Sequence, residues 1–178
     1  MNARSTHKKA APPLDNRRLR DLALHYAGRY ATTKSKLTRY LQRKIHERGW
    51  KEGESAADLE RLAQDFADLG YINDAAYAEA RARSFARRGY GARRLDQDIY
   101  AAGISDGDAA DARAESANTT FTSAQTFARR KRIGPYATEP APPEKRQKQL
   151  AAFMRAGHGY DMAKRFVFAE PGDEVEEE

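Results

Sequence analysis

Three glycines spaced 54 residues apart constrain the fold of this chain more than any other feature of its sequence. Gly49, Gly103 and Gly157 each follow a stretch in which apolar residues recur at helical spacing. Glycine is common immediately after a helix, so the spacing predicts a helix-and-glycine unit that occurs three times. The apolar residues four positions before the glycines also correspond: Ile45, Ile99 and Phe153.

The third copy of this repeat is less regular than the first two. Leu41 and Leu95 precede their glycines by eight positions, but the corresponding residue of the third copy is Gln149, with Leu150 after it. The sequence therefore leaves the register of the third repeat open.

The rest of the chain also favours helices over strands. Alternating apolar and polar residues are missing, whereas apolar residues three and four positions apart are common. We predict an all-α protein of about nine short helices, arranged as three tandem three-helix repeats. The predicted repeats are 14–70, 71–118 and 119–169. Tandem units contact only their neighbours, so we expect an elongated array with the scattering profile of an extended particle.

Three further segments have compositions typical of disordered chain. Residues 1–13 form a basic, proline-ended tail, residues 138–144 contain three prolines, and residues 170–178 contain six acids and no base. Residues 1–169 hold 32 basic and 20 acidic residues, a net charge of +12 against +6 for the whole chain. This high positive charge favours polyanionic partners, because binding releases the counterions condensed on them.

The composition also argues against several classes of protein. The chain has no cysteine, and its basic N-terminus lacks the apolar core of a signal peptide. No apolar run approaches the ~20 residues of a transmembrane helix. We expect a cytoplasmic protein with no membrane partner and no disulfide.

No sequence pattern indicates catalysis. The segment Gly89-Tyr90-Gly91 would need a third glycine where Arg94 stands to complete a dinucleotide-binding fingerprint, and no phosphate loop occurs elsewhere. The four histidines lack the spacing of metal ligands, and we interpret them as surface residues. We predict a protein that is not an enzyme, with no catalytic residue, metal site or cofactor.

Arginine pairs on either side of that glycine turn are the strongest candidates for a binding surface. Helical phase directs Arg87 and Arg93 away from the apolar faces of their helices, and Arg88 lies at the turn. The guanidinium group suits forked contacts with phosphate or carboxylate. A run of charges is often only a solvated helix face, and that alternative stays open. The candidate residues for binding nucleic acid or a protein partner are Arg39, Arg43, Arg83, Arg87, Arg88, Arg93, Arg94, Arg130, Lys131 and Arg132.

Arg81 is interpreted as structural, because it lies within the apolar face of its helix. We expect its stem to pack in the core and its guanidinium to pair with an acid such as Asp65 or Asp74. Two other arginines are expected to pair one helical turn along the chain: Arg83 with Glu79 and Arg94 with Asp98.

The middle repeat resembles the RecX regulators of the bacterial RecA recombinase. The resemblance is carried by residues 66–74 (FADLGYIND), Tyr77-Ala78, residues 87–95 (RRGYGARRL) and Gly103-Ile104-Ser105. It extends more faintly over most of the chain, from about residue 19 to residue 168. The resemblance implies a curved array of three three-helix repeats that has no catalytic residues.

The resemblance also implies a function. RecX proteins bind along the groove of the RecA–DNA filament and modulate its ATPase, strand-exchange and co-protease activities, usually by inhibition. We therefore expect the RecA filament and single- and double-stranded DNA as partners, and a monomeric protein. Two alternatives stay open: a helical nucleic-acid-binding module that acts without a recombinase, and a structural adaptor whose basic faces only keep it in solution.

Overall fold

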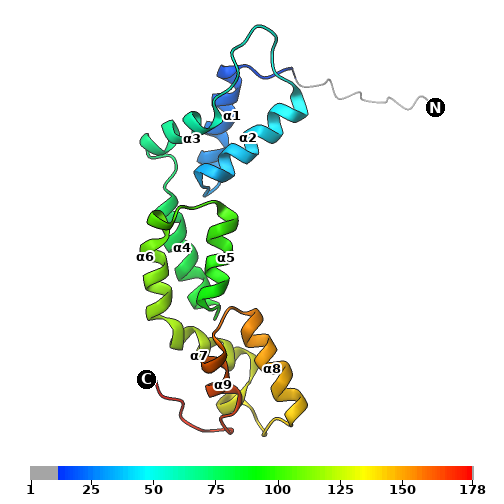
Figure 1. Cartoon of the computed structure of the whole chain (residues 1–178), viewed down its shortest axis with the longest axis vertical. Coiled ribbons are helices and arrows are strands. Elements are labelled where there is room, and N and C mark those ends of the chain that lie inside the picture. Colours follow the sequence, from blue (N-terminus) through cyan, green and yellow to red (C-terminus); the bar gives the residue numbers. More distant parts are fainter. Residues whose placement is uncertain (1–11, 178) are drawn as a thin grey trace, which may run out of the picture. The chain divides into compact units, whose positions relative to one another are not determined.

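The computed structural model describes residues 12–177, and within this range the chain is all-helical (Figure 1). This confirms the predicted fold class. Of the tail predicted for residues 1–13, residues 1–11 lie outside the described range. The helices are α1 (Asn16–Arg29), α2 (Lys34–Arg48), α3 (Leu59–Asp68), α4 (Asp74–Arg87), α5 (Ala92–Ala102), α6 (Asp106–Asn118), α7 (Thr120–Lys131), the 3-10 helix η1 (Gly134–Tyr136), α8 (Pro143–Arg155) and α9 (Tyr160–Val167).

The helices form three bundles of three, each around its own hydrophobic core. The chain divides into two compact units, of which the first, Met1–Asn73, contains α1 to α3. The second unit, Asp74–Glu178, contains both the α4–α6 bundle and the α7–α9 bundle. The three-repeat prediction is therefore confirmed, while the curved, elongated form of the array stays a prediction for solution scattering to test.

The three glycines of the repeat end the middle helix of each bundle. Gly49 and Gly103 cap α2 and α5, and Gly157 follows α8 by two residues. Their φ angles are 78°, 69° and 96°, a backbone region that is strained for residues with a Cβ atom. The repeat therefore reflects one local requirement, a residue with positive φ just after each middle helix.

Gln149 settles the register of the third repeat. Gln149 is 9% exposed and occupies the position that Leu41 and Leu95 fill in the first two bundles, whereas Leu150 is only partly buried. The Oε1 atom of Gln149 has no hydrogen-bond partner within the described residues. The third repeat thus keeps the spacing of the other two and accepts a polar residue at a core position.

The first bundle is closed by the segments that flank its first two helices. The backbone N–H of Leu14, before α1, donates to the carbonyl of Gly49, after α2, at 2.9 Å. The N–H of Lys51 donates to the carbonyl of Leu14 at 2.8 Å. Leu14 is fully buried, so this short contact seals the core between the two helices.

The second bundle uses small side chains where α4 meets α6. Four alanines are buried there, and their size allows the two helix backbones to approach closely. They are Ala78 and Ala82 of α4 and Ala109 and Ala112 of α6. Leu95 and Ile99 of α5 complete this core.

The proline-rich segment 138–144 was predicted to be disordered, and for its last two residues this is wrong. Pro143 and Glu144 form the start of α8. Proline suits the first turn of a helix, because its fixed φ is helical and its missing N–H would have no partner there.

The acidic tail also differs from the prediction of a disordered segment. Residues 170–177 form no helix, but they contact the third bundle. The Arg146 guanidinium lies 2.8 Å from the Glu170 carboxylate, and the N–H of Gly172 donates to the carbonyl of Pro135 at 3.1 Å. Val175 packs against the third core. The composition of residues 170–178 did not predict this packing, because a single valine among six acids hardly changes the average hydropathy of the segment.

Candidate nucleic-acid and protein interface

The turn Gly89-Tyr90-Gly91 joins α4 to α5 and is held by the third bundle. The N–H of Gly91 donates to the carbonyl of Ala156 at 2.9 Å, and that of Arg93 donates to the carbonyl of Gly157 at 3.2 Å. A Cβ atom on Gly91 would lie 2.4 Å from the Gly157 oxygen. Gly91 therefore allows two backbones to touch, a role that the sequence analysis did not anticipate.

His158 holds the same turn from the third bundle. The residue is only 1% exposed, so the interpretation of this histidine as a surface residue is wrong. Its Nε2 atom lies 3.1 Å from the carbonyl oxygen of Gly89, and its ring contacts the rings of Phe127 and Phe153. Burial lowers the pKa of His158, and the hydrogen bond to Gly89 opposes this shift. The ring is therefore a neutral Nε2–H donor at physiological pH.

This arrangement predicts that the second unit loses stability in mildly acidic solution. Below the ordinary histidine pKa near 6.5, the unfolded chain binds a proton that the buried ring of His158 does not. The free energy of unfolding should be level above that pH and fall below it, by up to about 1.4 kcal/mol per pH unit. Thermal melting between pH 7.5 and 5 measures the slope. In His158→Gln, which keeps a donor but cannot titrate here, the slope should flatten, and an equal slope in both proteins would contradict the assignment.

Two arginines from different bundles converge on the ring of Tyr90. The guanidinium carbon of Arg88 lies 4.9 Å from the ring centroid, and that of Arg130 lies 5.9 Å from it. Arg87, the last residue of α4, and Arg93, in the first turn of α5, are also exposed. Among residues 12–177, none of these four guanidinium groups has an ion-pair partner. The structure thus joins the predicted clusters of the second and third repeats around a tyrosine that the sequence analysis did not select.

The other two predicted arginines of the second bundle are partly neutralised or differently bound. The pair of Arg83 with Glu79 is confirmed at 3.3 Å, and Glu115 lies 3.9 Å from the same guanidinium. The predicted pair of Arg94 with Asp98 is wrong, because Arg94 donates to the side-chain oxygen of Gln97 at 3.4 Å.

Asp98 is occupied by Arg81. Two nitrogens of the Arg81 guanidinium donate to the two oxygens of Asp98 at 2.7 and 2.9 Å, which raises the pKa of Arg81. The expected partners Asp65 and Asp74 are therefore wrong, and Asp65 pairs with Arg61 instead. The interpretation of Arg81 as a structural residue fits this geometry, since its guanidinium also lies 4.6 Å from the centroid of the Phe85 ring.

The basic cluster of the third bundle lies at the C-terminal end of α7. Arg130, Lys131 and Arg132 are exposed and have no ion-pair partner within the described part of the chain. Arg129 and Arg130 line a hollow of about 310 Å³ together with Gln125 and Thr126. The free carbonyl groups at the C-terminal end of α7 favour these cationic side chains. The positive charge of the side chains is not neutralised by an acid among the described residues, so it can attract an anion.

The first unit contributes two predicted residues on α2. Arg39 donates from Nε to the carbonyl of Ser35 at 3.3 Å. Arg43 lies 3.5 Å from the Glu47 carboxylate and 5.7 Å from the centroid of the Tyr40 ring. Arg43 is therefore shared between an acid and an aromatic ring.

Two negative findings concern residues 12–177. No helix in this range is long and apolar enough to cross a membrane. No three acidic or histidine side chains in it are grouped closely enough to hold a metal ion.

Comparison with known proteins identifies the family. A model described as "RecX, second three-helix domain" matches residues 73–112. The Regulatory protein RecX of Myxococcus xanthus (strain DK1622) is 34% identical over 160 residues, which cover 86% of each chain. The crystal structure of RecX from Lactobacillus salivarius has the same fold, with a TM-score of 0.58 and 20% identity over 83% of this chain and 91% of that chain. A second structure, of regulatory protein RecX, also has a TM-score of 0.58, with 18% identity over 83% of this chain and 69% of its own. The chain belongs to the RecX family of regulatory proteins.

Proposed function

We propose that this protein inhibits the RecA recombinase by binding in the groove of the RecA–DNA filament, where it modulates ATPase, strand-exchange and co-protease activity. The observation that carries the proposal is the convergence of Arg88 and Arg130 on Tyr90, in the turn between the exposed Arg87, which ends α4, and the exposed Arg93 in the first turn of α5. These four guanidinium groups, which have no acid partner among residues 12–177, suit the phosphates of DNA or carboxylates on the recombinase.

The rigidity of the glycine turn supports the proposal. The turn is fixed by backbone hydrogen bonds from Gly91 and Arg93 and by the contact between His158 and Gly89. A surface that is ordered before binding loses less conformational entropy when the partner arrives, so more of the contact energy appears as affinity. On this proposal the protein acts by binding alone, as a cytoplasmic monomer without a cofactor.

The test is the ATPase activity of RecA on single-stranded DNA while this protein is titrated in. We expect the rate of ATP hydrolysis to fall as the protein is added. We also expect this protein to bind DNA more tightly when recombinase and ATP are present. If DNA binding is the same with and without the recombinase, and the ATPase rate does not change, the protein is a nucleic-acid-binding module that acts without a recombinase partner.

The acidic tail is expected to weaken DNA binding. Gly172 contacts Pro135, three residues after the basic cluster of α7, so the tail lies beside the connection that follows those cations. Replacement of Glu174, Glu176 and Glu177 by Gln removes three negative charges and keeps the packing of Val175. We expect tighter DNA binding and a steeper dependence on salt, with an unchanged melting temperature. Unchanged affinity would make the tail only a packing and solubilising segment.

A further inference from the structure

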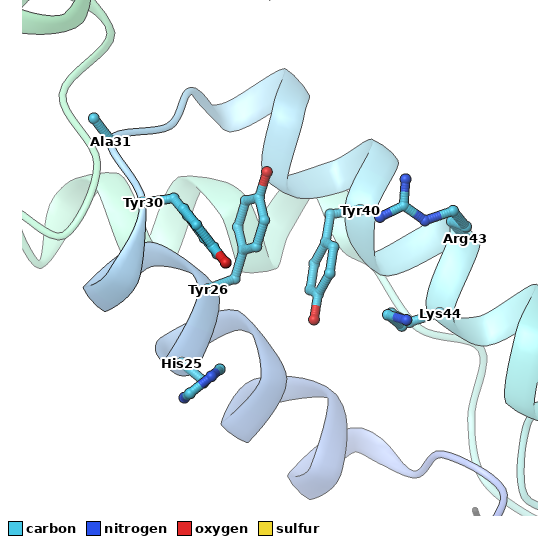
Figure 2. A pocket seen from close by; sticks show the side chains of 7 residues that line it. All are labelled: His25, Tyr26, Tyr30, Ala31, Tyr40, Arg43 and Lys44. Carbon is cyan, nitrogen blue, oxygen red and sulfur yellow. The ribbon is translucent and has the colours of Figure 1, made fainter.

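A row of three tyrosines lines a hollow in the first bundle (Figure 2). The rings of Tyr26 on α1 and Tyr40 on α2 are stacked, with centroids 4.1 Å apart and planes 12° apart. Tyr30 stands against the other side of Tyr26 at 5.3 Å. The hollow has a volume of about 560 Å³ and is lined by His25, Tyr26, Tyr30, Ala31, Tyr40, Arg43 and Lys44.

The outermost ring of this row is open to solvent. Tyr30 is 50% exposed and lies at the C-cap of α1, outside the buried core that Leu19, Leu37 and Leu41 provide. The Tyr26–Tyr40 stack joins α1 to α2, so the inner rings are fixed by the fold. A half-exposed aromatic ring on a fixed support offers a flat apolar surface to a second ring.

Cations stand at both ends of the row. The guanidinium carbon of Arg29 lies 5.7 Å from the centroid of the Tyr30 ring. At the other end, Arg43 and Lys44 lie 5.7 and 5.8 Å from the centroid of Tyr40. One carboxylate, that of Glu47, is close to both of these cations, at 3.5 Å from Arg43 and 2.5 Å from Lys44.

We propose that this hollow binds an unpaired base of single-stranded DNA. The base stacks on the exposed ring of Tyr30, and a neighbouring phosphate takes the place of Glu47 as the partner of Arg43 and Lys44. Rings that alternate with cations are how proteins hold single strands without reading sequence, because every base has a π-face. In a duplex the faces of each base are covered by its stacked neighbours, so only an unpaired base fits. The inference goes beyond the proposed function, because it requires no recombinase.

The experiment compares two dye-labelled probes of equal length, an oligo(dT) strand and an abasic strand, in fluorescence anisotropy with the whole protein. Tyr30→Ala should weaken binding to oligo(dT) by about 5- to 150-fold, the usual range for one stacked base, and leave binding to the abasic strand unchanged. Tyr30→Phe keeps the ring and should retain affinity for oligo(dT). Tyr160→Ala is the matched control, since Tyr160 is 53% exposed on the third bundle and no ring contact involves it among residues 12–177.

Glu47→Gln tests the phosphate part of the site. Without the competing carboxylate, both probes should bind more tightly and with a steeper salt dependence. The site is overturned if Tyr30→Ala affects the two probes equally or affects neither, because a protein-docking surface would give that result. A change of affinity in Tyr160→Ala as large as that in Tyr30→Ala would overturn it as well. The RecA ATPase measurement is independent of these probes, so failure here leaves the proposed function in place.

Discussion

Replacement of Gly91 by alanine is expected to lower the melting temperature of the second unit by roughly 12 °C or more. A Cβ atom at this position would lie 2.4 Å from the Gly157 oxygen, 2.5 Å from its carbonyl carbon and 2.7 Å from the His158 nitrogen. All three atoms belong to backbone, so no side chain can rotate away. Overpacking of this kind costs about 3 kcal/mol or more, and each kcal/mol corresponds to about 4–8 °C for a unit of this size.

Gly159→Ala is the matched control for this prediction. Gly159 lies in the same unit at the N-cap of α9, and a Cβ atom at this position would have no neighbour within 4 Å among the described residues. Its replacement should change the melting temperature by only a few degrees. Differential scanning calorimetry measures both variants, and similar melting temperatures for the two would show that the turn and the third bundle are not in close contact.

The fold could be predicted because its signals are local. Periodic apolar residues predict a helix, and a glycine supplies the positive φ that follows it, so Gly49, Gly103 and Gly157 revealed the repeat without tertiary information. The close approach at Gly91 could not be predicted in this way. Its φ of −85° is ordinary, and its reason is an atom 66 positions further along the chain.

In the candidate site, too, contacts within one helix could be predicted and contacts between helices could not. The pair of Arg83 with Glu79 follows from helical geometry within α4 and was predicted correctly. The pair of Arg81 with Asp98 joins two helices, so it depends on how α5 packs against α4. Helical periodicity predicts the face of the helix on which a residue lies, but not which residues of a neighbouring helix pack against that face.

His158 and Tyr90 were missed for a related reason. Neither belongs to a motif, and each gains its role from a neighbour in another bundle: Gly89 for His158, and Arg130 for Tyr90. A signal was present in the sequence, since Tyr90 stands between two glycines that were already singled out. An aromatic residue within an arginine-rich turn is a possible platform for a guanidinium group.

Combined replacement of Arg87, Arg88 and Arg93 by alanine is expected to weaken binding to the recombinase filament or DNA by roughly 10- to 100-fold at physiological salt. The three side chains are exposed, and none is paired with an acid among the described residues. If they contact duplex phosphates, the slope of log affinity against log salt should flatten by about three, whatever the DNA sequence. If they contact carboxylates on the recombinase, inhibition of the filament should fall while binding to bare DNA barely changes.

Arg81→Ala separates a lost contact surface from a damaged fold. Arg81 donates to both oxygens of Asp98 and packs on the Phe85 ring, so its removal leaves Asp98 without its partner and uncovers part of the second core. We expect Arg81→Ala to lower the melting temperature clearly and to change the affinity little. The triple variant should lose affinity and keep its helix content, as measured by circular dichroism. The two variants are in the same bundle, but one is expected to change its melting temperature and the other its binding affinity. If the triple variant still inhibits the filament fully, the arginines beside the turn are a solvated surface, and the filament must contact the protein elsewhere.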